Sequence, residues 1–396
     1  MLSARLRAQS AAGVLLAALA VEFADELFDG TKSAAMPLIR HDLTLSYAQI
    51  GLLAAVPLIA GGLLELPVGV LSGSGRRRRR FILAGGLVFA AAILTAGLAG
   101  TFAALLAALT LFFPASGAFV SLTQSALLDS DAGRRPQQMA RWTLAGSAGA
   151  VTGPLMLAAV LAAGGTWRLA FLVVAACSGV AWLAVASSGR GECGPDPGDA
   201  DDAEPAWPGW RRAMTVVREA GALRWLLLVE ASDLLLDVFS AFLALYLVVV
   251  ARASAPVAAL GVAVRLAAGL AGDVILLRLL EHRNGRRVLR ASVWLTLVLF
   301  PAFLLAPGVW LKLALLAGVT LATAPWYPVL TAELFDSLPG RSGLAVSLSS
   351  AAGLAGGLGP LAIGLLAQQF GLGWAVTALC VVPVLMLAAP RADPAG

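Results

Sequence analysis

The chain has 396 residues, of which 59% are apolar and 13% are charged, and its mean hydropathy is +0.86. A soluble domain is roughly 45–50% apolar and about 25% charged, so this composition excludes a soluble enzyme, a secreted disulfide-rich scaffold and a disordered chain. At about 33 residues for each membrane span with its connection, the length accommodates about twelve spans. We predict an all-α polytopic membrane protein.

The first apolar segment resembles a cleavable signal peptide, because two arginines precede it and it ends in Ala18-Leu19-Ala20. However, the apolar character resumes after Glu22 and further hydrophobic segments follow. We therefore interpret it as a first span that is retained in the mature protein.

Twelve apolar segments follow one another along the chain. They are residues 11–38, 46–71, 81–99, 101–128, 139–163, 167–188, 222–250, 254–280, 288–306, 309–335, 343–369 and 371–389. Between the sixth and the seventh, residues 189–212 are rich in Pro, Gly and Asp and cannot bury apolar surface. We predict two six-helix bundles, 1–188 and 213–396, joined by a solvated linker at 189–212.

Arginines are concentrated in every second connection. Those connections carry Arg76 to Arg80, Arg134, Arg135, Arg283, Arg286, Arg287, Arg290 and Arg341, whereas the alternate ones carry only Arg40, Arg168 and Arg252. Short basic loops stay in the cytoplasm, so we predict that both termini and the linker are cytoplasmic. The run from Arg76 to Arg80 is interpreted as a topology anchor in the connection after span two, with binding of anionic lipid head groups as the alternative.

The two halves contain matching residues at a nearly constant offset. Glu22, Asp25 and Asp29 in span one correspond to Glu230, Asp233 and Asp237 in span seven, 208 residues later. Glu65 corresponds to Asp273, and Thr123 to Thr331, at the same offset. These matches predict two homologous six-helix repeats, and parallel repeats of this kind place a substrate site at their interface near the bilayer midplane.

The six-plus-six layout, the arginine-rich turn after span two and Gly149-x-x-x-Gly153-Pro154 in span five resemble the major facilitator superfamily over essentially the whole chain. The span-five element is similar to the signature of proton-coupled drug antiporters, and residues 45–53 are similar to bacterial efflux members such as fosmidomycin-resistance proteins. The turn lacks the family's Asp. The resemblance implies a monomer in the bacterial cytoplasmic membrane that works by alternating access.

The resemblance also implies gating roles for Arg76 and Arg77 in the turn and for Gly149, Gly153 and Pro154 in span five. For the glycines there is a simpler alternative, since glycines four residues apart allow two helices to pack closely.

Nine acidic side chains and two basic ones, Lys32 and Arg265, lie more than five residues from either end of a predicted span. An ionised side chain costs about 2.5–3.5 kcal/mol at the bilayer centre, so these groups must line water, form pairs or carry protons. The spacing i, i+3, i+7 places each acidic triplet on one face of its helix, and Glu26 joins the first stripe. The resemblance implies that the two stripes face each other across the transport path.

Carboxylates that are crowded and poorly solvated favour their protonated form, so they can bind and release protons. We predict proton coupling by the stripes, with Asp25 and Asp233 as the main carriers, Asp29 and Asp237 next, and Glu22 and Glu230 contributing. The alternative for any one of these residues is that it caps a helix end or lies at the head-group level.

Arg265, near the middle of span eight, is either a structural partner of Asp237 or Asp273 or a ligand of an anionic substrate group. Glu65 and Asp273 are predicted to act in gating. The remaining predicted substrate contacts are Glu26, Gln124, Trp326 and Tyr327, although aromatic residues in spans more often serve packing. Pro325 and Pro328 are expected to loosen span ten.

No His lies in a span and the three cysteines lack metal-ligand or disulfide spacing, so we predict neither a metal site of the His and Cys type nor a cofactor. No nucleotide-binding motif is present. We predict a transporter and not an enzyme, without nucleic-acid partners, that exports a small cationic or amphipathic molecule in exchange for protons. The alternatives are carboxylate-mediated transport of a divalent cation and a membrane sensor that does not transport.

Overall fold

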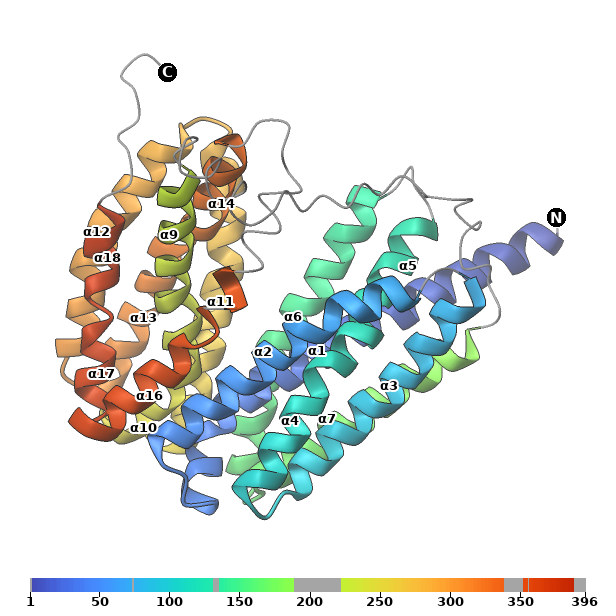
Figure 1. Ribbon diagram of the computed structural model, residues 1–396, viewed down its shortest axis with the longest axis horizontal. Helices are drawn as coiled ribbons and strands as arrows, with labels where there is room; N and C mark the ends of the chain where they lie inside the picture. Colours follow the sequence, from blue (N-terminus) through green and yellow to red (C-terminus); the bar gives the residue numbers. More distant parts are fainter. Residues whose placement is uncertain are drawn as a thin grey trace. The chain divides into compact units, whose positions relative to one another are not determined.

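The computed structural model describes residues 2–72, 75–130, 135–188, 222–337, 352–354 and 356–387, and every regular element within these ranges is a helix (Figure 1). Among the described residues, nine helical segments are long and apolar enough to cross a membrane. This confirms the prediction of an all-α polytopic membrane protein, and a total of twelve spans is compatible with it. The predicted linker at 189–212 lies outside the described residues.

The outer surface of these helices is apolar. The most exposed large side chains include Leu305, Trp374 and Trp310, with exposed fractions of 83%, 73% and 71%. In water such side chains would be an aggregation liability, whereas in a bilayer they contact lipid.

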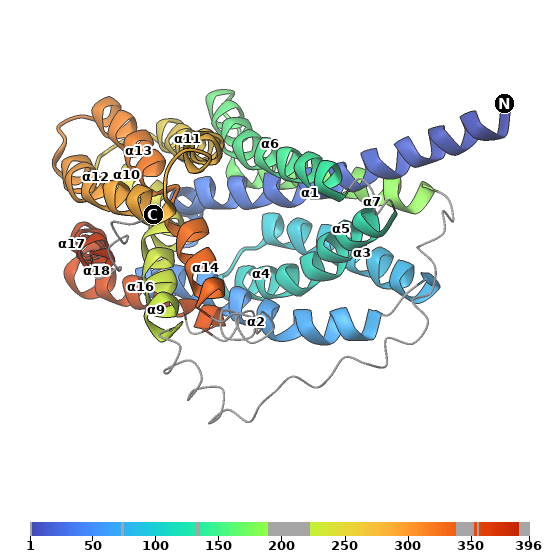
Figure 2. The same ribbon diagram turned by 90° about the horizontal axis from the view of Figure 1, so that it is seen from above.

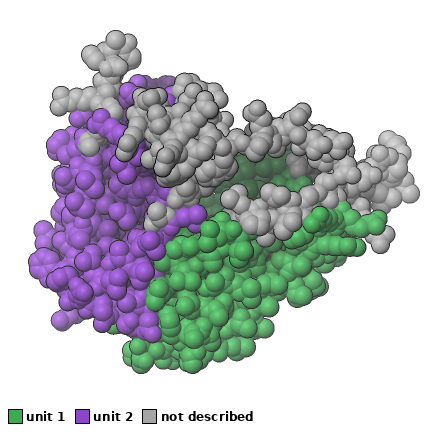
Figure 3. Space-filling view, viewed as in Figure 1, with its two compact units in different colours: residues 1–45, 52–200, 255–263 green, residues 46–51, 201–254, 264–396 purple. Residues whose placement is uncertain are grey.

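The chain forms two compact units (Figure 3), of which unit 1 contains residues 1–45, 52–200 and 255–263. Its helices are α1 (Leu2–Asp42), α2 (Tyr47–Ser72), α3 (Gly75–Leu98), α4 (Phe102–Ser116), η1 (Gly117–Ser121), α5 (Leu122–Ser130), α6 (Arg135–Ala162) and α7 (Trp167–Ser187). Aromatic rings fill the space between the helices: the ring centroids of Phe28 and Phe112 are 4.6 Å apart, and those of Phe28 and Phe171 are 5.2 Å apart.

Unit 2 contains residues 46–51, 201–254 and 264–396. Its helices are α9 (Ala222–Asp233), η3 (Leu234–Val238), α10 (Phe239–Val249), α11 (Ala255–Leu280), α12 (Gly285–Leu305), α13 (Val309–Thr323), α14 (Trp326–Asp336), α16 (Gly359–Phe370), α17 (Leu372–Ala378) and α18 (Val381–Met386). Phe239 and Phe300 meet edge to face with their centroids 5.4 Å apart.

The first turn of α2 is assigned to unit 2, and the first turns of α11 are assigned to unit 1. Within unit 2, the Tyr47 amide donates to Gln368 Oε1 at 3.1 Å. Position 47 and position 255, where α2 and α11 begin, are related by the same 208-residue offset as the acids. The division into contiguous halves, 1–188 and 213–396, stays a prediction.

In unit 1, α1 and α6 run side by side in close contact (Figures 1 and 2). Glycines on α6 allow this approach: a Cβ on Gly153 would lie 2.5 Å from the Leu27 carbonyl oxygen and 2.7 Å from the Thr31 nitrogen. Gly149 meets the Phe23 carbonyl in the same way. The glycines of span five therefore let two helices pack backbone to backbone, and their gating role stays a prediction.

Several predicted spans are not regular α-helices throughout; span twelve, for example, is interrupted between Ala378 and Val381. Span four contains a wide π-helical turn, η1, and span seven contains another, η3. Span ten is interrupted between Thr323 and Trp326, with Pro325 as the N-cap residue of α14. The interruption confirms the prediction for Pro325, because proline has no amide hydrogen to donate and clashes with the preceding turn. Pro328 lies inside α14 and does not interrupt it.

The run from Arg76 to Arg80 lies within the first turns of α3 and not in a connection, so the sequence-based boundary of span three, at residue 81, was wrong. A cationic run at a helix N-terminus opposes the helix dipole. Arg79 resolves part of this conflict by donating to the carbonyl oxygens of Ser188, at 3.2 Å, and Ala186, at 3.0 Å. It thereby caps the C-terminal end of α7, where a positive charge is favourable.

Candidate functional site

The acidic stripe of unit 1 lies on α1. Glu22 and Asp25 are half-buried, whereas the side chain of Asp29 is 56% exposed. Ser116, the last residue of α4, donates a hydrogen bond to Asp25 Oδ1 at 2.9 Å. Glu22 packs against Gly146 of α6, where a Cβ would lie 2.5 Å from Glu22 Oε1. Both carboxyl groups are therefore held between helices inside unit 1.

A cation at the end of this stripe pairs with its most exposed acid. Lys32 Nζ lies 2.5 Å from Asp29 Oδ1, one helical turn away. The same ammonium group lies 5.3 Å from the centre of the Phe113 ring and 5.9 Å from that of Phe28, within the range of cation–π attraction. Within the described residues, no basic side chain forms an ion pair with Glu22, Asp25 or Glu26.

The acidic stripe of unit 2 reproduces this pattern of exposure. Glu230 and Asp233 on α9 are half-buried, and Asp237, inside η3, is exposed. Glu230 Oε2 packs against Gly356, close to where a Cβ on that residue would lie. Asp233 accepts a hydrogen bond from the adjacent Ser232, whose oxygen is 3.4 Å away. The two stripes are thus alike in burial as well as in sequence.

Each stripe lies next to a π-helical turn. In unit 1, Ser116, which binds Asp25, immediately precedes η1; in unit 2, η3 begins directly after Asp233 and contains Asp237. Such turns are rare and are frequently found at functional sites. In η3 the carbonyl oxygen of Leu236 accepts hydrogen bonds from the side chains of Ser240 and Arg265 instead of serving only the helix ladder.

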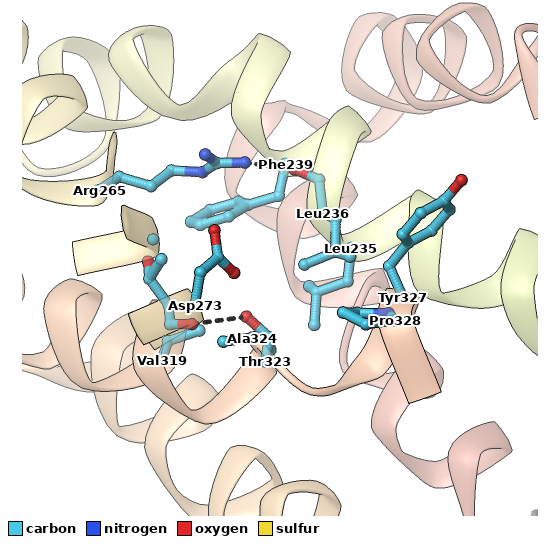
Figure 4. A pocket seen from close by; sticks show the side chains of 12 residues that line it. Leu235, Leu236, Phe239, Arg265, Asp273, Val319, Thr323, Ala324, Tyr327 and Pro328 are labelled. Carbon is cyan, nitrogen blue, oxygen red and sulfur yellow. Dashed lines mark hydrogen bonds between the residues drawn. The ribbon is translucent and has the colours of Figure 1, made fainter. Parts of the chain in front are cut away.

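Unit 2 contains a cavity of about 400 Å³ beside its acidic stripe (Figure 4). It is lined by Leu235, Leu236, Phe239, Arg265, Gly269, Asp273, Val319, Thr320, Thr323, Ala324, Tyr327 and Pro328. Figure 4 shows Arg265 and Asp273 extending from α11 toward Phe239 and the carbonyl of Leu236. Pockets for small molecules are roughly 300–1,000 Å³ in volume with a few placed polar groups in an apolar wall, and this cavity fits that description.

Arg265 reaches from α11 to the helix that carries the stripe. Its Nη2 donates to the Leu236 carbonyl oxygen at 2.6 Å and also contacts Ser240 Oγ. Position 240 corresponds to Lys32 at the 208-residue offset. A cation is therefore present at equivalent places in the two repeats, but it comes from the stripe helix in unit 1 and from a neighbouring helix in unit 2.

The predicted aromatic contacts differ in position. Tyr327 is 53% exposed and lines the cavity. Trp326 is completely buried, and its Nε1 donates to Ser292 Oγ at 3.0 Å. Trp326 thus packs α14 against α12, as expected for an aromatic residue in a span. Gln124 of α5 donates to the sulfur of Met139 at 3.6 Å.

The remaining predicted gating residues are spread over both units. Asp273 lines the cavity of unit 2, and Pro154 lies against Gly30 in the contact between α1 and α6. Arg76 and Arg77 are exposed at the start of α3. The side chain of Glu65, on α2, lies outside the described residues.

Several residues of these sites were not predicted from the sequence. Ser116 and Ser240 are serines in apolar helices, and nothing in their local sequence distinguishes them from other helix serines. The repeat offset could have identified Ser240, because it falls opposite Lys32. Among the described residues, no group of three or more His, Cys, Asp or Glu side chains is arranged to hold a metal ion.

A comparison with known families matches residues 18–275 to the Major Facilitator Superfamily. This match covers more than half of the chain. The chain belongs to the major facilitator superfamily. It is therefore a multi-pass membrane transporter and not an enzyme, as predicted.

Several solved structures of transporters share the fold. A bacterial homologue of the human lysosomal transporter Spinster, in an inward-facing and unoccupied conformation, is 17% identical over 98% of this chain and 99% of that chain, with a TM-score of 0.74. The nucleoside transporter NupG is 12% identical over 95% and 100%, with a TM-score of 0.71. The peptide transporter POT in complex with sulfate is 14% identical over 95% and 94%, with a TM-score of 0.69. No curated protein matches the sequence. At these identities the likeness establishes the fold alone.

Proposed function

We propose that this superfamily member is a proton-coupled exporter of a small cationic or amphipathic molecule, acting as a monomer in a bacterial cytoplasmic membrane with both termini in the cytoplasm. The observation that supports proton coupling is the pair of acidic stripes. At equivalent positions of two repeats, two acids are half-buried and a third is exposed.

The physical reason is the cost of burying charge. A carboxylate that is removed from water without a paired cation is destabilised relative to its neutral form. In unit 1, the cation Lys32 pairs with the exposed Asp29 and not with Asp25, which accepts only a hydroxyl hydrogen bond among its described contacts. Asp25 and its counterpart Asp233 are therefore suited to bind a proton in one conformation and to release it when hydration changes.

The cavity of unit 2 supports the proposal that the substrate is a small cationic or amphipathic molecule. Its wall is mostly apolar, and Asp273 provides a carboxylate that can hold a cationic group. Tyr327 offers an exposed aromatic face, which favours amphipathic and cationic molecules. Export is favoured by the span-five motif that resembles drug antiporters.

The test is reconstitution of the purified chain in liposomes that contain a pH-sensitive dye. A substrate panel of aromatic amines and amphipathic cations is added, and substrate-dependent proton movement is recorded. Asp25→Asn and Asp233→Asn are each expected to reduce proton movement at least about tenfold, because an amide cannot carry the proton. Asp336→Asn, an exposed Asp at the end of α14, is the matched control and should transport like the unaltered protein.

Two results would count against the proposal. Substrate transport that moves no protons would contradict the proposed proton coupling. The absence of substrate-dependent flux for every compound of the panel would contradict the proposed export of cationic or amphipathic molecules. Flux of a divalent cation that is abolished in both Asn variants without proton movement would instead favour carboxylate-mediated metal transport.

A further inference from the structure

We propose that three arginines at the start of α3, Arg76, Arg77 and Arg80, bind the phosphate group of an anionic phospholipid from the surrounding bilayer. These three residues, the α3 arginine triad, are the exposed members of the run from Arg76 to Arg80. They belong neither to an acidic stripe nor to the wall of the unit 2 cavity. The inference is therefore independent of the proposed substrate and of proton coupling.

One face of α3 is exposed along the length of the helix. Its large apolar side chains are Leu87, Leu94 and Leu98, with exposed fractions of 57%, 42% and 63%. Arg77 and Arg80 continue this face, because positions 77, 80, 84, 87, 91, 94 and 98 are all exposed and follow one another at three or four residues. The two arginines thus lie on the face whose leucines contact lipid.

The distance along α3 places the triad at the level of the lipid head groups. Leu98 is the last residue of α3, and Arg80 precedes it by 18 residues, which corresponds to about 27 Å at about 1.5 Å per residue. The hydrocarbon core of a bilayer is about 30 Å thick. When the leucines of this face cover the core, Arg80 lies at its edge, and Arg76 and Arg77 lie about one turn further out, beside the phosphates.

The other two arginines of the run are held by the protein. Arg78 and Arg79 are half-buried, and Arg79 donates to the carbonyl oxygens of Ser188 and Ala186 at the end of α7. Within the part of unit 1 that the structure describes, no acidic side chain forms an ion pair with the triad. The run therefore divides into a half-buried pair that packs α3 and an exposed triad that faces the bilayer.

An anionic phospholipid complements this triad in charge and in geometry. Each guanidinium presents parallel N–H donors that match two oxygens of a phosphate group. Five consecutive arginines repel one another and oppose the dipole at the start of α3, so a bound phosphate relieves an unfavourable concentration of positive charge. The arginine distribution predicts that this end of α3 is cytoplasmic, where anionic lipids give the leaflet a negative surface potential.

A topology anchor requires positive charge near the membrane but no particular site, so the test compares the triad with dispersed arginines. Arg141 on α6, Arg224 on α9 and Arg278 on α11 are also exposed and are predicted to lie on the cytoplasmic side. Replacing these three by Gln removes the same charge as replacing the triad by Gln. This variant is the matched control.

The experiment measures thermal unfolding of the purified full chain in detergent micelles that are titrated with lipid. The probes are phosphatidylglycerol, which is anionic, phosphatidylcholine with the same acyl chains, which is zwitterionic, and glycerol 3-phosphate, which is a soluble anion. Phosphatidylglycerol is expected to raise the unfolding temperature, because a ligand of the native state stabilises it. Replacing the triad by Gln should raise the phosphatidylglycerol needed for half-maximal stabilisation at least about tenfold, and the control variant should leave it unchanged.

A single substitution keeps the test informative if the triple variant does not fold. Arg80→Gln is expected to raise the phosphatidylglycerol requirement about fivefold, because each basic residue near an anionic surface contributes about that factor in affinity. Arg141→Gln is its matched control and should bind phosphatidylglycerol like the unaltered protein.

The proposal is overturned if phosphatidylglycerol does not stabilise the unaltered chain, if phosphatidylcholine stabilises it equally, or if the triad and control variants weaken phosphatidylglycerol binding to the same degree. Equal stabilisation by glycerol 3-phosphate would assign the triad to a soluble anion and would overturn the lipid as its ligand. These outcomes are measured without a proton gradient or a substrate, so they are distinct from failure of the proposed transport function.

Discussion

The two acidic stripes have the same acids and the same order of burial, yet they are supported differently. In unit 1, Asp25 accepts from Ser116 of another helix and Lys32 is built into α1. In unit 2, the hydroxyl donor to Asp233 among the described residues is its neighbour Ser232, and the cation comes from α11. The acids have thus been kept in both repeats while their partners have diverged, which is expected if the acids perform a shared task and the partners give each unit its own role.

The largest expected effect concerns how each stripe helix is packed. Gly153→Ala would put a Cβ 2.5 Å from a backbone oxygen of α1, which cannot move without separating the helices. Gly359→Ala, in unit 2, would meet the side-chain ends of Leu234 and Val238 at 2.9 and 3.0 Å, which can rotate away. We expect Gly153→Ala to lower the free energy of unfolding by about 3 kcal/mol and Gly359→Ala by about 1 kcal/mol or less.

The measurement is unfolding by sodium dodecyl sulfate in mixed micelles, followed by tryptophan fluorescence. Gly179→Ala on α7 is the control, since nothing lies within 4 Å of its Cβ position and alanine favours helix. Equal losses for Gly153→Ala and Gly359→Ala would contradict the view that α6 packs against its stripe helix more closely than α16 packs against η3.

The intermediate effect concerns the hydroxyl partners of the central acids. Ser116→Ala removes the 2.9 Å hydrogen bond to Asp25 and is expected to cost about 1 kcal/mol in the free energy of unfolding. Ser232→Ala should cost less, because Ser232 Oγ lies 3.4 Å from Asp233 and is satisfied by the Val229 carbonyl at 2.7 Å. The same unfolding assay measures both.

Ser178→Ala is the matched control for the hydroxyl partners, since Ser178 is buried and donates only to a carbonyl of its own helix. If Ser232→Ala lowers the free energy of unfolding as much as Ser116→Ala does, the hydroxyl groups stabilise Asp25 and Asp233 equally. The two units would then not differ in how their central acids are held.

Much of this arrangement followed from the sequence because it depends on spacing within one helix. The 3.6-residue period fixed the acids on one face, the four-residue glycine spacing indicated a close helix contact, and Pro325 predicted a break. Each of these inferences is independent of which helix lies opposite.

The residues that sequence reasoning missed depend on contacts between helices. Ser116 is defined by its approach to Asp25, 91 positions away, and Trp326 turned inward to Ser292 while Tyr327 beside it lines the cavity. The two π-helical turns also had no local signature. Such features arise when a whole unit packs, so periodicity along one segment does not reveal them.

The smallest expected effect concerns Lys32 and Arg265, the cations beside the two stripes. It tests most directly whether their different positions, on the stripe helix in unit 1 and on α11 in unit 2, reflect different roles. Lys32 and Asp29 form an ion pair in which Asp29 is 56% exposed, so a double-mutant cycle with Lys32→Gln and Asp29→Asn should give a coupling of less than about 1 kcal/mol in the free energy of unfolding. Arg265→Gln should cost more than Lys32→Gln, because it leaves the Leu236 carbonyl inside η3 without one of its donors. A coupling of about 2 kcal/mol or more between Lys32 and Asp29 would contradict the expectation that the cation contributes little to stability in unit 1. The cation of the stripe would then be structural in unit 1 as well, and its transfer to α11 in unit 2 would no longer mark a difference in role.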